Sequence, residues 1–164
     1  APDIREKFPG SAAEDALDTQ KYILSQKQNC YRKALVNGIV NTDTVIESLL
    51  DTIMSSPATS SNPGDYIKAH PIEYRELTYY GDYTLRYVFR EFLKGGQTGL
   101  KGHIMRAVMD SLIGGESMGL ETETGQAYFD EWLALAKRTD AQNGAEYMKQ
   151  SAPKAWILLQ MLGE

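Results

Sequence analysis

Cysteine and histidine are scarce in this chain. Its 164 residues include one cysteine, Cys30, and two histidines, His70 and His103. A single cysteine excludes an intramolecular disulfide and cannot complete a thiolate zinc site. The two histidines also lack the short spacing that is typical of metal ligands. The sequence therefore predicts no bound metal, and we expect Cys30 to be a small buried apolar side chain.

Long apolar runs and an excess of basic charge are also missing. The longest apolar stretch, within residues 155–162, falls short of the roughly 20 residues that a transmembrane helix needs. The formal net charge of -5 gives no general attraction to nucleic acid. We therefore expect no membrane span and no nucleic-acid partner. The start Ala1-Pro2-Asp3, without an initiator methionine, favours a mature secreted or periplasmic chain over a cytoplasmic one.

The familiar motifs of nucleotide binding and catalysis do not occur. The sequence has no phosphate-binding glycine loop, dinucleotide fingerprint, metalloprotease helix or EF-hand loop. Residues 151–154 spell the S-x-x-K motif of penicillin-recognising enzymes, but the other motifs of those enzymes should follow it and do not. We interpret Ser151 as a helix cap. The sequence favours a protein that is not an enzyme and carries no cofactor, although folding can still assemble an acid–base set from distant residues. The candidates for such a set are His70, Glu73, Glu76 and Asp82.

Apolar residues at intervals of three and four are, by contrast, abundant. Between the glycine pairs at 95–96 and 114–115 they form one stripe along a helix: Leu100, Ile104, Met105, Val108, Met109, Leu112 and Ile113. Similar stripes recur along the chain, and no segment has the alternation of a strand. The sequence predicts an all-α single domain over residues 1–164, an irregular bundle of six or seven helices. Residues 1–10 are expected to form an irregular N-terminal arm.

Capping residues and glycines set the expected helix boundaries. The helices are predicted over residues 11–37, 42–54, 71–94, 99–113, 125–139, 145–150 and 153–162. Residues 55–65 contain two prolines, a glycine and several serines, so we expect a flexible loop there. Gly81 interrupts the helix over 71–94 and marks a kink or a close helix crossing.

Tyrosine is concentrated in the helix over 71–94. The chain has ten tyrosines, and five of them belong to this helix: Tyr74, Tyr79, Tyr80, Tyr83 and Tyr87. Because tyrosine is enriched at protein interfaces, the sequence predicts a partner-binding surface with a basic edge. Its members are Tyr79, Tyr83, Tyr87, Arg86, Arg90 and Lys94. The competing interpretation is a central helix surrounded by its own domain, with the basic residues on an ordinary solvated face.

These features favour a non-catalytic protein-binding module: an adaptor, an inhibitor or a subunit of an assembly. A protein partner is expected, and a homo-oligomer is compatible with the same surface. The alternative hypothesis is a helical pocket for a small ligand, a tetrapyrrole or a lipid. In that pocket His103 acts as an axial ligand, and Met105 and Met109 line the wall. The simpler interpretation of His103 is a partly exposed side chain that packs by its ring edge.

Residues 82–87, Asp-Tyr-Thr-Leu-Arg-Tyr, are followed by Leu93 and a glycine turn. This segment resembles the central helix of phycobiliproteins. That family attaches its bilin to a cysteine just before the motif, and no cysteine stands there in this chain. The resemblance covers less than a quarter of the chain, and no function is carried over from it.

Overall fold

The computed structural model describes residues 41–58, 60–117 and 122–163. The chain divides into two compact units, residues 1–42 and 43–164, and nearly all the described residues belong to the second. Expectations for the arm over 1–10, the helix over 11–37 and Cys30 lie outside the described residues. The expectation of one domain over 1–164 stays a prediction.

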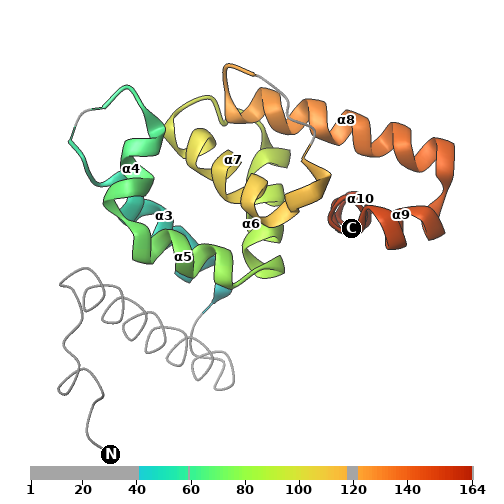
Figure 1. The fold of residues 1–164 in the computed structure, drawn as a ribbon, viewed down its shortest axis with the longest axis horizontal. Coiled ribbons are helices and arrows are strands. Elements are labelled where there is room, and N and C mark those ends of the chain that lie inside the picture. The colour runs from blue at the N-terminus through green and yellow to red at the C-terminus, as the bar shows by residue number, and fades with distance from the viewer. Residues whose placement is uncertain (1–40, 59, 118–121, 164) are drawn as a thin grey trace, which may run out of the picture. The chain divides into compact units, whose positions relative to one another are not determined.

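Every regular element in the described residues is helical, which confirms the all-α class (Figure 1). The described elements are α3 (Thr42–Met54), α4 (Pro63–Ala69), α5 (Pro71–Tyr79), α6 (Asp82–Lys94), α7 (Leu100–Ile113), the 3-10 turn η1 (Gly114–Glu116), α8 (Gly125–Asn143), α9 (Ala145–Ser151) and α10 (Pro153–Leu162). Six or seven helices is therefore only approximate, because α4 was not expected and the helix over 71–94 is divided in two.

Helix α4 begins inside the segment that was expected to be a loop over 55–65. Asn62 precedes the helix, and its side-chain oxygen accepts a hydrogen bond from the backbone N–H of Gly64 at 2.9 Å. Pro63 occupies the first turn, where a missing N–H costs nothing. Asn, Pro and Gly in this order therefore start a helix here, although the same residues also indicate a turn.

Gly81 separates α5 from α6, so the tyrosine-rich segment is two helices. Its φ of 55° lies in the left-handed region, which glycine adopts without a side-chain clash. The hydroxyl of Thr84, at the start of α6, donates a hydrogen bond to the carbonyl of Leu77 near the end of α5 at 2.7 Å. The side chain of Thr84 thus holds the break in place, and it satisfies the Leu77 carbonyl, which lies in the last turn of α5.

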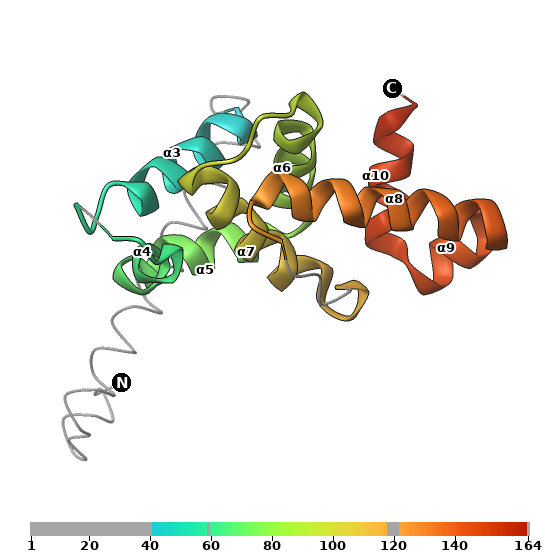
Figure 2. The same ribbon diagram turned by 90° about the horizontal axis from the view of Figure 1, so that it is seen from above.

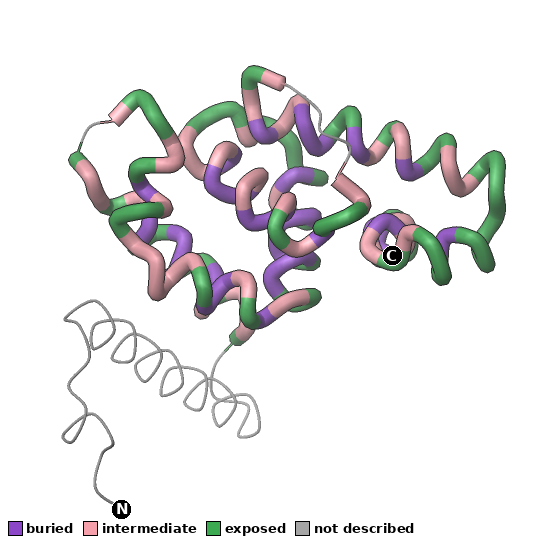
Figure 3. The backbone as a smooth tube through the Cα atoms, in the orientation of Figure 1, coloured by how far each residue is buried: buried purple, intermediate pink, exposed green. Residues whose placement is uncertain are grey.

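Helix α6 lies at the centre of the aromatic core. Phe92 stacks on Phe129 of α8 with ring centroids 5.0 Å apart, and Phe89 stacks on Trp132 at 5.7 Å. Buried positions face inward along α6, α7 and the first half of α8 (Figure 3). This packing fixes one side of α6 in the core and leaves its opposite side to solvent.

Helices α7 and α8 approach each other closely at two glycines. A Cβ on Gly125, the first residue of α8, would lie 2.1 Å from the carbonyl oxygen of Gly102 in α7. Next to this contact, the backbone N–H of Gln126 donates to the carbonyl of Gln97, and its side-chain amide donates to the carbonyl of Phe92. The crossing therefore joins α8 to α7 and to the turn after α6.

Helices α8, α9 and α10 form a group that extends beside α3–α7 (Figures 1 and 2). The expected cap of α8, Thr124, is confirmed, because its hydroxyl accepts a hydrogen bond from the N–H of Ala127 at 3.0 Å. The expected cap of α10 is wrong. Ser151 is the last residue of α9, and the carboxylate of Glu116 accepts from the N–H groups of Lys154 and Ala155. A cap that is supplied from a distant residue leaves no local signal in the sequence.

Candidate functional site

The outer face of α6 is the candidate binding surface. We use this name for the exposed residues Tyr83, Arg86, Arg90, Leu93 and Lys94 of α6 together with Tyr79 at the end of α5. Tyr83 is 56% exposed and Tyr79 is 46% exposed, so both place aromatic area in solvent. The face combines aromatic area, phenolic hydroxyls and basic groups.

Tyr87 does not belong to the outer face, so its burial gives no support to the expected role in partner contact. It is only 4% exposed, because α6 turns it toward the core between α3 and α7. The ammonium of Lys101 lies 5.7 Å from its ring centroid. Burial raises the pKa of Tyr87, and the negative charges of Glu91 and Glu47 raise this pKa further. The break at Gly81 and this burial reduce the expected row of three tyrosines to Tyr79 and Tyr83.

The basic edge of the outer face is partly neutralised by ion pairs. Arg90 pairs with Asp43 of α3, and Lys94 pairs with Glu91 one turn back at 2.7 Å. Arg86 makes no ion pair in the part of the chain that the structure describes. Of the three basic residues, Arg86 is therefore the one whose charge is available to a partner without breaking a pair.

Glu91 is the carboxylate with the strongest electrostatic shift near this face. Burial alone would raise its pKa, but hydrogen bonds from Lys94 and Lys101 and the charge of Lys101 outweigh that effect and lower the pKa to about 2. Its side chain is 13% exposed, and Lys101 reaches it from α7 at 3.1 Å. This cluster ties α6 to α7 and is part of the support beneath the outer face.

A second polar cluster lies between α7 and α8. The hydroxyl of Tyr128 donates to the carboxylate of Asp110, and the guanidinium of Arg106 lies 4.4 Å from the Tyr128 ring centroid. Burial and the hydrogen bond to Asp110 raise the pKa of Tyr128 to about 12. These contacts hold two helices together, and we assign the cluster to the fold.

The residues of the alternative ligand pocket do not come together. Met105 and Met109 are fully buried in the core, whereas His103 is half-buried. Residues two apart in an α-helix lie roughly 160° apart around its axis, so His103 and Met105 are on different sides of α7. A ligand held by His103 would therefore not contact Met105 from the same side of α7.

The candidate acid–base set is also dispersed. His70 Nδ1 lies 3.9 Å from Glu73, but Glu76 accepts a hydrogen bond from buried Tyr80, and Asp82 pairs with Lys154 of α10. His70 Nε2 is engaged by Ser56, whose hydroxyl lies 2.8 Å away. No group of three His, Cys, Asp or Glu side chains is arranged for a metal ion within the described ranges. None of the helices described there has the length and apolar character required to cross a bilayer.

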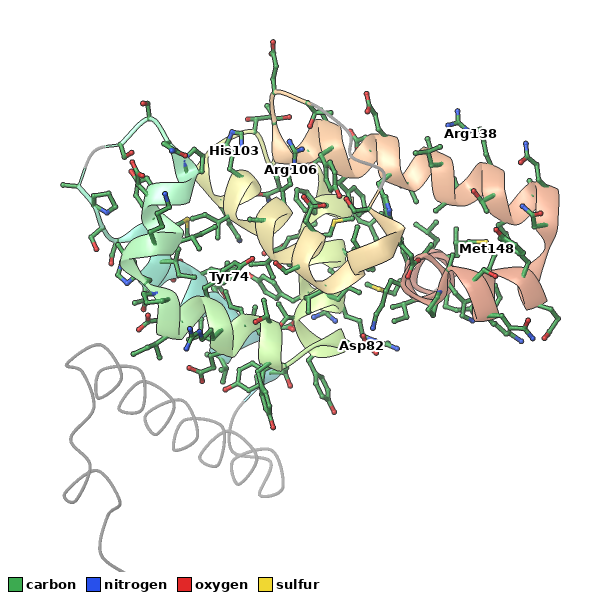
Figure 4. All side chains as sticks on the ribbon, viewed as in Figure 1. Tyr74, Asp82, His103, Arg106, Arg138 and Met148 are labelled. Atoms are coloured by element: carbon green, nitrogen blue, oxygen red, sulfur yellow. The ribbon has the colours of Figure 1, made fainter. Side chains whose placement is uncertain are left out.

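The sequence did not reveal a half-open cavity between η1, α8, α9 and α10. The cavity has a volume of about 280 Å³. The residues that line it include the buried Met148 of α9, labelled in Figure 4, and Glu116 of η1. The apolar stripes of α8 and α10 were visible in the sequence, but nothing local indicated that they leave a space.

Comparison of the chain with protein-family models, with curated proteins and with solved structures found no match.

Proposed function

We propose that the protein is a non-catalytic protein-binding module that contacts its partner through the outer face of α6. The observation that carries this proposal is that Tyr83, 56% exposed, lies beside the exposed Arg86 on a helix whose other side is buried in the core. Among the described residues, Arg86 has no ion-pair partner. Tyrosine and arginine are among the three residue types that are enriched in interface hot spots.

The rigidity of α6 supports the same proposal. Leu85, Val88 and Phe89 are fully buried on its inner side, so the backbone that carries the outer face is fixed before a partner arrives. A preorganised surface loses less conformational entropy on binding than a mobile one does. Leu93, 39% exposed, adds apolar area near the end of the helix.

The experiment compares four forms of the protein as bait in extracts of cells that express it, with quantitative mass spectrometry of the captured proteins. The forms are the unmodified chain, Tyr83→Ala, Arg86→Glu and the control Arg138→Glu. Arg138 is exposed on α8, away from α6 (Figure 4). We expect one stoichiometric partner with the unmodified chain and the control, and at least a fivefold loss with each outer-face variant.

Both outer-face variants should keep the thermal stability of the unmodified chain, because their side chains lie in solvent. A partner retained in full by both folded variants would exclude the outer face. A second copy of this chain as the captured partner would make the protein a homo-oligomer that uses the same surface.

A further inference from the structure

The cavity between η1, α8, α9 and α10 has an apolar floor and an open rim. Met148 is fully buried, and Trp132, Ala136 and Ala155 are each less than a tenth exposed. At the rim, Tyr147 is 45% exposed. A volume of about 280 Å³ lies at the lower end of the range for small-molecule sites, so it fits a ligand with one small ring or a short alkyl body.

Glu116 supplies the only charge among the described residues that line this cavity. Its two carboxylate oxygens accept from the N–H groups of Lys154 and Ala155, each at 3.0 Å, and its carbonyl accepts from the indole N–H of Trp132 at 3.0 Å. The first two bonds fix the carboxylate at the start of α10, and the third holds the backbone of Glu116. Each carboxylate oxygen can accept a further hydrogen bond, and the start of α10 offsets only about half of its charge.

Two aromatic side chains line the same cavity. Trp132 contributes to the floor and Tyr147 to the rim. The faces of aromatic rings attract ammonium groups, with tryptophan and tyrosine the strongest. A negative carboxylate, aromatic rings and apolar walls together complement a cation with an apolar body, and they disfavour an anion.

We propose that this cavity binds a small organic ammonium ion. The ammonium group donates hydrogen bonds to the Glu116 carboxylate, and the apolar body of the ligand lies against Met148, Ala136 and Trp132. Tyr147 covers the open side. The site is independent of the outer face of α6, which contributes no residue to it.

The test titrates the full chain, labelled with ¹⁵N, with 2-phenylethylammonium and follows the backbone amides by NMR. The matched probe is 3-phenylpropionate, which has a similar body and the opposite charge. We expect saturable shifts for the ammonium probe at the amides of Lys154 and Ala155, which donate to Glu116. The expected Kd is on the order of 0.1–1 mM. The anionic probe should give no saturable shift at these amides.

Two variants locate the site. Glu116→Gln should weaken binding about tenfold, because it removes the charge from the acceptor. Tyr147→Ala should weaken it about threefold, and since Tyr147 is largely exposed this change leaves the fold intact. Glu131→Gln, an exposed carboxylate on α8 outside the cavity, should bind like the unmodified chain.

Three results would each overturn the proposal: no saturable shift with the ammonium probe, equal binding of the anionic probe, or unchanged binding in both variants. If Glu116→Gln does not fold, unchanged binding in Tyr147→Ala is sufficient to reject the site.

Discussion

Glu91 shows how one side chain can hold two helices together by its charge. Its carboxylate accepts from Lys94 on its own helix and from Lys101 on α7, and its pKa of about 2 lies below the ordinary value of 4.5. A lowered pKa means that the ionised form is favoured more in the folded chain than in the unfolded one. The same side chain lies next to buried Tyr87, so its charge also acts on the core.

We expect the contribution of Glu91 to vanish in acid. Between about pH 4.5 and about pH 2 the unfolded chain takes up the proton first, so the stabilisation is present above this window and is lost as the pH falls through it. Glu91→Gln has no such titration. The gap in free energy of unfolding between the two chains, measured by urea denaturation, should therefore narrow from about pH 6 to about pH 3.

The exposed Glu131→Gln is the control for that series, because it removes a carboxylate that makes no ion pair in the described residues. A gap for Glu91→Gln that stays constant with pH would contradict the lowered pKa.

At the scale of elements, the position of α8 depends on a contact between two backbones. Gly125 leaves no room for a side chain at the point where α8 meets α7, because a Cβ there would collide with the backbone of Gly102. The aromatic contacts of Phe129 and Trp132 with α6 follow within the next two turns of α8. A displacement at the start of α8 therefore disturbs the aromatic core as well.

Gly125→Ala should lower the free energy of unfolding by about 1–3 kcal/mol, because the added methyl group collides with the Gly102 carbonyl and forces the helices apart. Helix propensity alone predicts the opposite sign, a gain of about 1 kcal/mol. The free energy of unfolding of Gly125→Ala, measured by chemical denaturation, distinguishes the expected loss from the expected gain. Gly115→Ala, where a Cβ meets nothing within 4 Å, should change stability little; a stabilised Gly125→Ala chain would refute the close contact.

The sequence was sufficient to predict helices that carry a clear apolar stripe, as in α3, α7 and α10. It was insufficient where one residue type serves two purposes: Asn62, Pro63 and Gly64 indicate a turn but begin α4. The outer face was only partly predictable, because Tyr83 and Tyr87 are one helical turn apart and yet one is exposed and the other buried. The cavity was not predictable, since Glu116 reaches α10 through tertiary packing alone.

At the scale of the described unit, burial is unevenly distributed. Helices α6 and α7 hold many buried side chains, whereas Met148 is the only buried residue of α9 and residues 141–147 are all exposed. Local opening costs least where few apolar contacts are lost. The end of α8 and the whole of α9 are thus the part of the C-terminal group that opens most easily.

Hydrogen exchange read by mass spectrometry should reveal this gradient. We expect amides of residues 140–150 to exchange at least tenfold faster than those of α6 and α7, because opening there disrupts little of the core. Equal protection of the two regions would show that the described unit opens as a whole. Addition of 2-phenylethylammonium should slow exchange in residues 140–150, if the cavity is occupied.

The arrangement of rings in the core also has an optical consequence. Both tryptophans of the chain, Trp132 and Trp156, lie in α8 and α10, and none occurs elsewhere. Trp132 is buried against Phe89, whereas Trp156 is half-buried beneath the ammonium of Lys149, 5.4 Å from its ring centroid. Indole emission moves to longer wavelength in polar surroundings, so Trp156→Phe leaves a blue-shifted signal from the α6–α8 junction. Trp132→Phe leaves a red-shifted signal from α10. Fluorescence excited at wavelengths longer than the tyrosine absorption band therefore reports on the C-terminal helices, whereas α3–α7 contribute no emission.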